Sequence, residues 1–77
     1  MKYAVVDERK HGDIYEKVFD SEKDAMDEAE MEWAHMVNSE RENSTFYVCS
    51  CELDKEECID YNTIEILKEW NRVKREA

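Results

Sequence analysis

Residues 20–37 read DSEKDAMDEAEMEWAHMV, and this segment sets how the rest of the chain must pack. Ser21 followed by Asp24 predicts a helix start, because a serine oxygen accepts from the N–H three residues on and acids favour the positive end of a helix dipole. At about 100° per residue, the apolar side chains then gather on one stripe, which consists of Ala25, Met26, Ala29, Trp33, Met36 and Val37. We expect one long amphipathic helix, from Ser21 or Glu22 to about Ser39 or Arg41.

The opposite side of this helix is acidic. Asp24, Glu28 and Glu32 follow one another at i, i+4 spacing, where like charges destabilise a helix by roughly 0.2–0.5 kcal/mol per pair. The sequence tolerates that penalty. The column is therefore either a docking surface for a protein partner with a basic surface or a solvated face that keeps the protein soluble, as most charge runs are. The predicted partner-binding residues are Asp24, Asp27, Glu28, Met31, Glu32 and His35.

The charge of the whole chain agrees with this interpretation. Its 21 acidic residues against 11 Lys and Arg give a net charge of −10, and residues 21–42 carry eight acids against Lys23 and Arg41. Such a field repels nucleic acid and acidic membranes and attracts basic surfaces. We therefore expect no direct nucleic-acid binding and no membrane association.

Strand patterns precede and follow the predicted helix in the sequence. Lys2–Asp7 and Ile14–Phe19 predict a hairpin whose loop holds Gly12, the single glycine of the chain. Thr45–Leu53 is rich in aromatic and β-branched residues and predicts the third strand. Both faces of Ile14–Phe19 are partly apolar, so we expect a sheet that is covered on more than one side.

The C-terminal part allows two interpretations. Asn62 followed by Glu65 predicts another helix start, and a broad helical stripe would then contain Ile64, Ile66, Leu67, Trp70 and Val73. Ile64 and Ile66 also permit a short strand. Whether residues 59–75 form a helix or a strand stays open at this point.

The element order predicts a single α+β domain over residues 1–77, in two layers. After a hairpin, a helix returns the chain so that the third strand runs antiparallel beside the first. This gives a three-stranded antiparallel sheet of order 2-1-3 with one long amphipathic helix on one face, in the order β-β-α-β-(α). The C-terminal helix, or a second copy of the chain in a homodimer, would cover the other face.

Three cysteines raise the question of a metal. Cys49, Cys51 and Cys58, with His11 or His35 as a fourth ligand, could form a zinc set, but the usual second Cys-x2–4-Cys pair is missing. Two cysteines two residues apart on a strand share one face and pack well in a core. We expect free thiols, no metal and no cofactor, with a small metal or redox protein as the alternative.

An odd number of cysteines fits a reducing compartment, and the chain shows no apolar run long enough to span a bilayer. Its first residues, Met1–Asp7, are charged too soon for a signal peptide. We expect a cytosolic protein.

No catalytic motif accompanies the acidic helix. His35 has no nucleophile or carboxylate that the sequence would place in a cleft, so we expect no enzyme.

The main prediction is an interaction module that presents an acidic helix face. A narrower alternative is a mobile-element inhibitor of the anti-CRISPR kind that occupies a nucleic-acid-binding groove. Carboxylates about 6 Å apart are, however, sparse beside phosphates about every 3.4 Å.

Several short motifs carry a resemblance over nearly the whole chain. They are Tyr3-Ala4-Val5-Val6-Asp7, Ile14-Tyr15, Phe19-Asp20, Ala25, Glu32-Trp33 and Phe46-Tyr47-Val48. In these positions the chain resembles a group of small acidic bacterial proteins associated with clostridial-type gut bacteria and their mobile elements. The resemblance implies a compact ββαβ-type domain that is not an enzyme, and it brings no catalytic residue with it.

Overall fold

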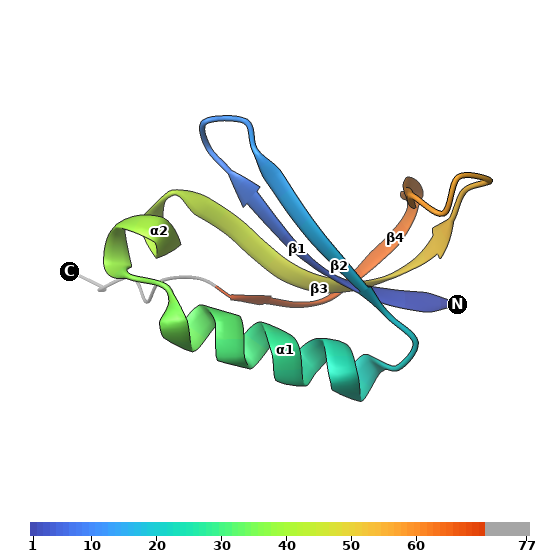
Figure 1. The fold of residues 1–77 in the computed structure, drawn as a ribbon, viewed down its shortest axis with the longest axis horizontal. Coiled ribbons are helices and arrows are strands. Elements are labelled where there is room, and N and C mark those ends of the chain that lie inside the picture. Colours follow the sequence, from blue (N-terminus) through green and yellow to red (C-terminus); the bar gives the residue numbers. More distant parts are fainter. Residues whose placement is uncertain (71–77) are drawn as a thin grey trace.

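The computed structural model describes residues 1–70. It contains two helices and four strands, in the order β1 (Lys2–Arg9), β2 (Ile14–Phe19), α1 (Glu22–His35), α2 (Asn38–Glu42), β3 (Ser44–Leu53) and β4 (Ile59–Trp70). The chain is an α+β protein, as predicted. Figure 1 shows α1 running along one side of the sheet, with β2 and β1 forming a hairpin.

The sheet is antiparallel throughout and has the order β2-β1-β3-β4. The predicted order 2-1-3 is thus confirmed for the first three strands. The prediction of three strands is wrong, because β4 adds a fourth beside β3. In the hairpin loop, Gly12 has a φ of 111°, a value that favours glycine.

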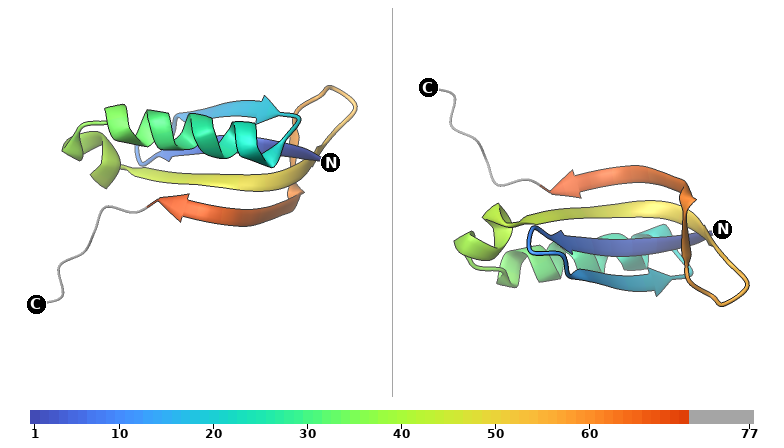
Figure 2. Two further views of the ribbon diagram at one scale, coloured as in Figure 1. Left: turned by 90° about the horizontal axis from the view of Figure 1, so that it is seen from below. Right: turned by 90° about the horizontal axis from the view of Figure 1, so that it is seen from above.

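α1 packs on the sheet through two alanines. Ala25 and Ala29 are fully buried against Val5, Phe46 and Val48, and their small side chains let the helix come close to the strands. The rim of this core is formed by larger, partly buried side chains, namely Tyr3, Phe19, Met26, Trp33, Met36 and Trp70. Figure 2 shows the helix on one face only, near β2 and β1.

Aromatic rings extend this core toward β4. The Phe46 ring stacks on Trp33 with centroids 5.6 Å apart and meets Trp70 edge-on, also at 5.6 Å. Such contacts contribute about 0.5–1.5 kcal/mol each beyond area burial. Phe46 therefore joins α1, β3 and β4.

The single long helix is a wrong prediction. α1 ends at His35, Met36 is extended, and a separate five-residue α2 follows. Val37, expected in the buried stripe, is 59% exposed. The guanidinium of Arg41 donates to the carbonyl oxygen of Trp33 at 2.7 Å, and Glu40 accepts from the N–H of Val37 at 3.0 Å. These bonds satisfy backbone groups at the break and let the chain turn into β3.

The predicted C-terminal helix is also wrong in the part that the structure describes. Ile59–Trp70 is a strand, so Asn62 does not start a helix, while Val73 lies outside the described residues. Backbone groups on the outer side of β3 need partners, because Phe46 to Cys51 are buried. Pairing with β4 supplies them, and this requirement outweighs the helical spacing of Ile64, Leu67 and Trp70.

β4 also covers the face opposite α1, here called the open face. Between the pairs Ser50–Glu65 and Glu52–Asp60, β3 has one residue and β4 has four, so residues 61–64 form a large bulge in β4. Figure 1 shows the resulting bend between the two parts of β4. Ile59 and Ile64 pack there against a second core of Ala4, Val6, Tyr47, Cys49 and Cys51. Part of the cover expected from a helix or a second copy thus comes from a strand of the same chain.

Candidate functional site

The predicted acidic residues lie on the side of α1 that borders β2. Ser21 caps the helix by accepting from the N–H of Asp24 at 3.1 Å, as the sequence predicts. Asp24 and Asp27 are exposed, whereas Glu28 and Glu32 are only partly exposed. Contrary to the expectation, the column of Asp24, Glu28 and Glu32 does not point straight into solvent, because its last two residues lie toward the sheet.

Lys17 of β2 explains this turn. Its ammonium lies 2.7 Å from Glu28 Oε2 and 2.9 Å from Glu32 Oε2. A single cation thus bridges two carboxylates and relieves their repulsion. Part of the negative charge that the sequence assigns to this surface is neutralised within the protein.

The two carboxyl groups respond differently to this environment. The hydrogen bond from Lys17 lowers the pKa of Glu28, while burial raises the pKa of Glu32. The same two glutamates raise the pKa of Lys17, which stays charged. Glu32 Oε2 is buried without a hydrogen bond of ordinary geometry, so the ion pair is its electrostatic compensation.

Between α1 and β2 lies a shallow hollow, here called the acidic depression. Its volume is about 360 Å³, and its lining consists of Phe19, Asp24, Asp27, Glu28 and Met31. Asp27 is also held by Lys23, whose Nζ lies 2.7 Å from Asp27 Oδ2. The depression combines three carboxylates with two apolar side chains, an arrangement that suits the aliphatic stem and charged head of a lysine or arginine.

The structure brings four of the six predicted residues together in this depression. Glu32 joins them indirectly, through Lys17. Met31 is 52% exposed, which fits its expected role as an apolar contact. His35 stands apart, because its Nδ1 lies 2.8 Å from the carbonyl oxygen of Met31 at the end of α1.

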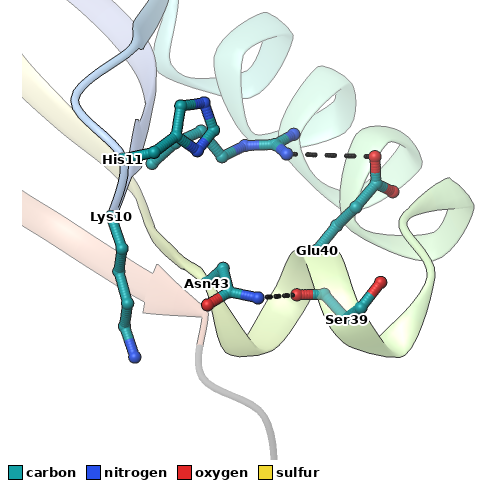
Figure 3. Close-up of a pocket in the computed structure, with 6 residues that line it drawn as sticks. Lys10, His11, Ser39, Glu40 and Asn43 are labelled. Carbon is teal, nitrogen blue, oxygen red and sulfur yellow. Dashed lines mark hydrogen bonds and ion pairs between the residues drawn. The ribbon is translucent and has the colours of Figure 1, made fainter.

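A second hollow, of about 450 Å³, was not foreseen from the sequence. Arg9, Lys10, His11, Ser39, Glu40 and Asn43 line it (Figure 3). The Lys10 N–H donates to the carbonyl oxygen of Asn43 at 2.9 Å, which ties the hairpin to α2. Arg9 is held by Asp7 at 3.0 Å. The basic run at residues 9–11 is the sequence feature that could have indicated this hollow. The contacts of Arg9 and Lys10 hold the hairpin against α2, so we interpret the hollow as a structural junction.

The open face carries two tyrosine–glutamate pairs that the sequence did not indicate. Tyr47 donates to Glu8 Oε2 at 2.8 Å, and Tyr61 donates to Glu16. Burial, followed by the glutamate hydrogen bond, raises the pKa of both tyrosines, which therefore remain protonated donors. The Tyr61–Glu16 bond connects the bulge of β4 with β2, at the other edge of the sheet.

The cysteines do not converge. Cys49 and Cys51 are buried in β3, whereas Cys58 is exposed in the loop before β4. Burial raises the pKa of Cys49 to about 11 and also raises that of Cys51, which disfavours the thiolate that binds metals. Within residues 1–70, no group of three or more Cys, His, Asp or Glu is arranged to hold a metal ion.

Among the same residues, no helix has the length and apolarity that a membrane crossing requires. Comparison of the chain with protein-family models, with curated proteins and with solved structures gives no match.

Proposed function

We propose that this chain is a cytosolic interaction module without catalytic activity, which binds a protein partner with a basic surface through the acidic depression. The observation that carries the proposal is the lining of that depression. Asp24, Asp27 and Glu28 surround the exposed Met31 at the border of α1 and β2. Within residues 1–70, the ion pairs of the four carboxylates on this side of α1 involve two lysines, Lys17 and Lys23, so these residues leave a negative excess for a partner.

Charge reversal at the two exposed aspartates tests the proposal. Glu28 and Glu32 are unsuitable positions, because a lysine there would lie beside Lys17 and disturb the fold. Asp24 and Asp27 are exposed, so Asp24→Lys with Asp27→Lys should keep the fold, although it removes the Lys23–Asp27 ion pair and one acid of the first turn of α1. Glu52→Lys with Glu56→Lys, at exposed positions far along the chain, changes the net charge equally and is the matched control.

The readout is chemical cross-linking in the native cytosol, followed by binding measurements with each purified partner at low and high salt. We expect the Asp24/Asp27 variant to lose a basic partner that the Glu52/Glu56 variant retains. Binding that both variants lose equally would reflect net charge alone. Unaltered partners for the Asp24/Asp27 variant would contradict the proposal.

The inhibitor of a nucleic-acid-binding protein is a narrower form of the same proposal. Its partner would be a basic nuclease, and the resemblance to bacterial mobile-element proteins is its motivation. It predicts that the protein and DNA compete for the nuclease in a salt-dependent manner. Nuclease binding to DNA that stays constant as the protein is added would remove this version and leave the broader one in place.

A further inference from the structure

β2 is an edge strand with free backbone groups. The Arg9 N–H donates to the carbonyl oxygen of Asp13 at 2.8 Å, and inward and outward positions alternate along an antiparallel ladder. Tyr15, Lys17 and Phe19 therefore direct their backbone groups toward β1. The remaining positions, Ile14, Glu16 and Val18, direct theirs away from the sheet, where residues 1–70 provide no neighbouring strand.

This edge lacks the bulges and the proline that protect many exposed strands. Its pairing with β1 is regular over the whole strand, and the chain has no proline. The single lysine of β2, Lys17, is folded inward onto Glu28 and Glu32. The other edge is different, because β4 has two register irregularities and carries Lys68.

Chemically different surfaces flank the β2 edge. On the open face, the side chains of Ile14 and Val18 are 53% and 41% exposed, and Glu16 between them accepts a hydrogen bond from Tyr61. On the side of α1, the acidic depression begins at Phe19. A strand added at this edge would place alternate side chains against an apolar surface and an acidic one.

We propose that β2 accepts an extended segment of the partner as an additional antiparallel or parallel strand. The segment would carry lysine or arginine at alternate positions, beneath α1, and apolar residues between them. This inference rests on the proposed function of the acidic depression and adds the mode of binding. Strand addition of this kind gains affinity from main-chain hydrogen bonds and specificity from alternate side chains.

The repeat distances support this occupant. Carboxylates at i, i+4 on α1 are spaced by about 6 Å along the helix. Alternate side chains of a strand are spaced by about 6.6–6.8 Å. Asp24 and Glu28, which both line the depression, make one such step, and over one step the difference stays within the reach of flexible lysine and arginine side chains.

A second copy of the chain fits less well. Pairing of two β2 strands about a two-fold axis would bring two α1 acidic surfaces to the same side of a continuous sheet. Each chain carries a net charge of −10, and like charges across an interface oppose association. Charge complementarity thus favours a basic segment of a partner, rather than a second copy of the chain, as the strand added beside β2.

The test uses the full chain labelled with ¹⁵N and a synthetic, end-capped octapeptide of alternating lysine and valine. We expect saturable binding that weakens with salt, and slower hydrogen exchange at the amides of Ile14, Glu16 and Val18. Val18→Pro removes one outward N–H and should raise the Kd at least about tenfold. Val18→Thr keeps the N–H and the branched shape and changes only the apolar contact, so it should raise the Kd less than Val18→Pro does.

Ile14→Pro, at the first residue of the strand, is the second edge variant should Val18→Pro fail to fold, as judged from its ¹⁵N spectrum. Asp24→Lys with Asp27→Lys is measured in parallel. Loss of binding on charge reversal but not on proline substitution overturns strand addition and leaves the acidic depression as the site. Loss on neither substitution contradicts both proposals.

No binding by the wild-type chain at low salt also overturns strand addition. Strand addition by a partner is also overturned if the chain sediments as a dimer and its β2 amides exchange slowly without peptide. The occupant of the edge is then a second copy of the chain.

Discussion

Lys17 Nζ lies 2.7 Å from Glu28 Oε2, so an ion pair joins β2 to α1 beside the acidic depression. Glu32 lies 2.9 Å from the same ammonium, so the three side chains form one cluster of charges. The pKa of Glu28 is lowered by its hydrogen bond to Lys17, and that of Glu32 is raised by burial.

These opposite shifts predict opposite effects of two conservative substitutions. A lowered pKa means that ionised Glu28 stabilises the fold above its ordinary pKa of 4.5 and that this contribution is lost as the pH falls. Glu28→Gln should therefore reduce the free energy of unfolding at neutral pH, and the difference should vanish in acid. A raised pKa means that the fold disfavours ionised Glu32, so Glu32→Gln should leave stability at neutral pH equal or higher.

Urea unfolding of the three proteins between about pH 3 and about pH 7 measures both effects. Equal losses of stability at neutral pH for the two variants would contradict the assignment.

Phe46 should be among the most sensitive core positions. It is fully buried and contacts both Trp33 and Trp70. Phe46→Ala removes these contacts and leaves a cavity, which typically costs about 3–5 kcal/mol, comparable to the whole stability of many small domains. Phe46→Leu keeps most of the volume and serves as the control. Chemical denaturation should show the alanine variant largely unfolded in water and the leucine variant folded.

Arg41 should stabilise the end of α1. Its Nη2 donates to the carbonyl oxygen of Trp33 at 2.7 Å, and its guanidinium carbon lies 5.1 Å from the centroid of the Trp33 ring. Arg41→Met removes both interactions and should lower the free energy of unfolding by about 1–2 kcal/mol. Arg41→Lys retains the charge but not the planar guanidinium. Its free energy of unfolding should therefore lie between that of the wild type and that of Arg41→Met. Faster amide exchange in the last turn of α1 would locate the effect.

The cysteines predict a simple pattern of reactivity. At about pH 8, a thiol reagent should modify Cys58 in the native protein and reach Cys49 and Cys51 only after denaturation, because these two are buried and the pKa of Cys49 is raised to about 11. Cys58→Ser should abolish the native reaction. Rapid modification of more than one thiol in the native state would contradict the burial of β3.

The helix–sheet core followed well from the sequence because its signals are local. Ser21 caps α1, and Ala25 and Ala29 lie in the predicted stripe. The break after His35 was missed because Arg41, six residues further on, supplies the bonds that end the helix. Helical periodicity does not show such a contact.

β4 was left open for a similar reason. Ile64 and Ile66 fit both periodicities, and only the free edge of β3 decides between them. Helical spacing predicted where the acidic surface lies, but it could not predict that part of its charge is neutralised. Lys17 belongs to another strand, and its approach to Glu28 depends on the packing of α1 over β2.

The bond between Tyr61 and Glu16 joins residues 45 positions apart and connects the two outer strands. An edge strand normally frays alone, since it has a neighbour on one side only. Here the bulge of β4 and the edge strand β2 each lose this bond when either lifts away, which favours opening of the two margins of the sheet together. The domain should then unfold in one step rather than peel from an end, and its folding should be slowed by the need to bring such distant segments into register.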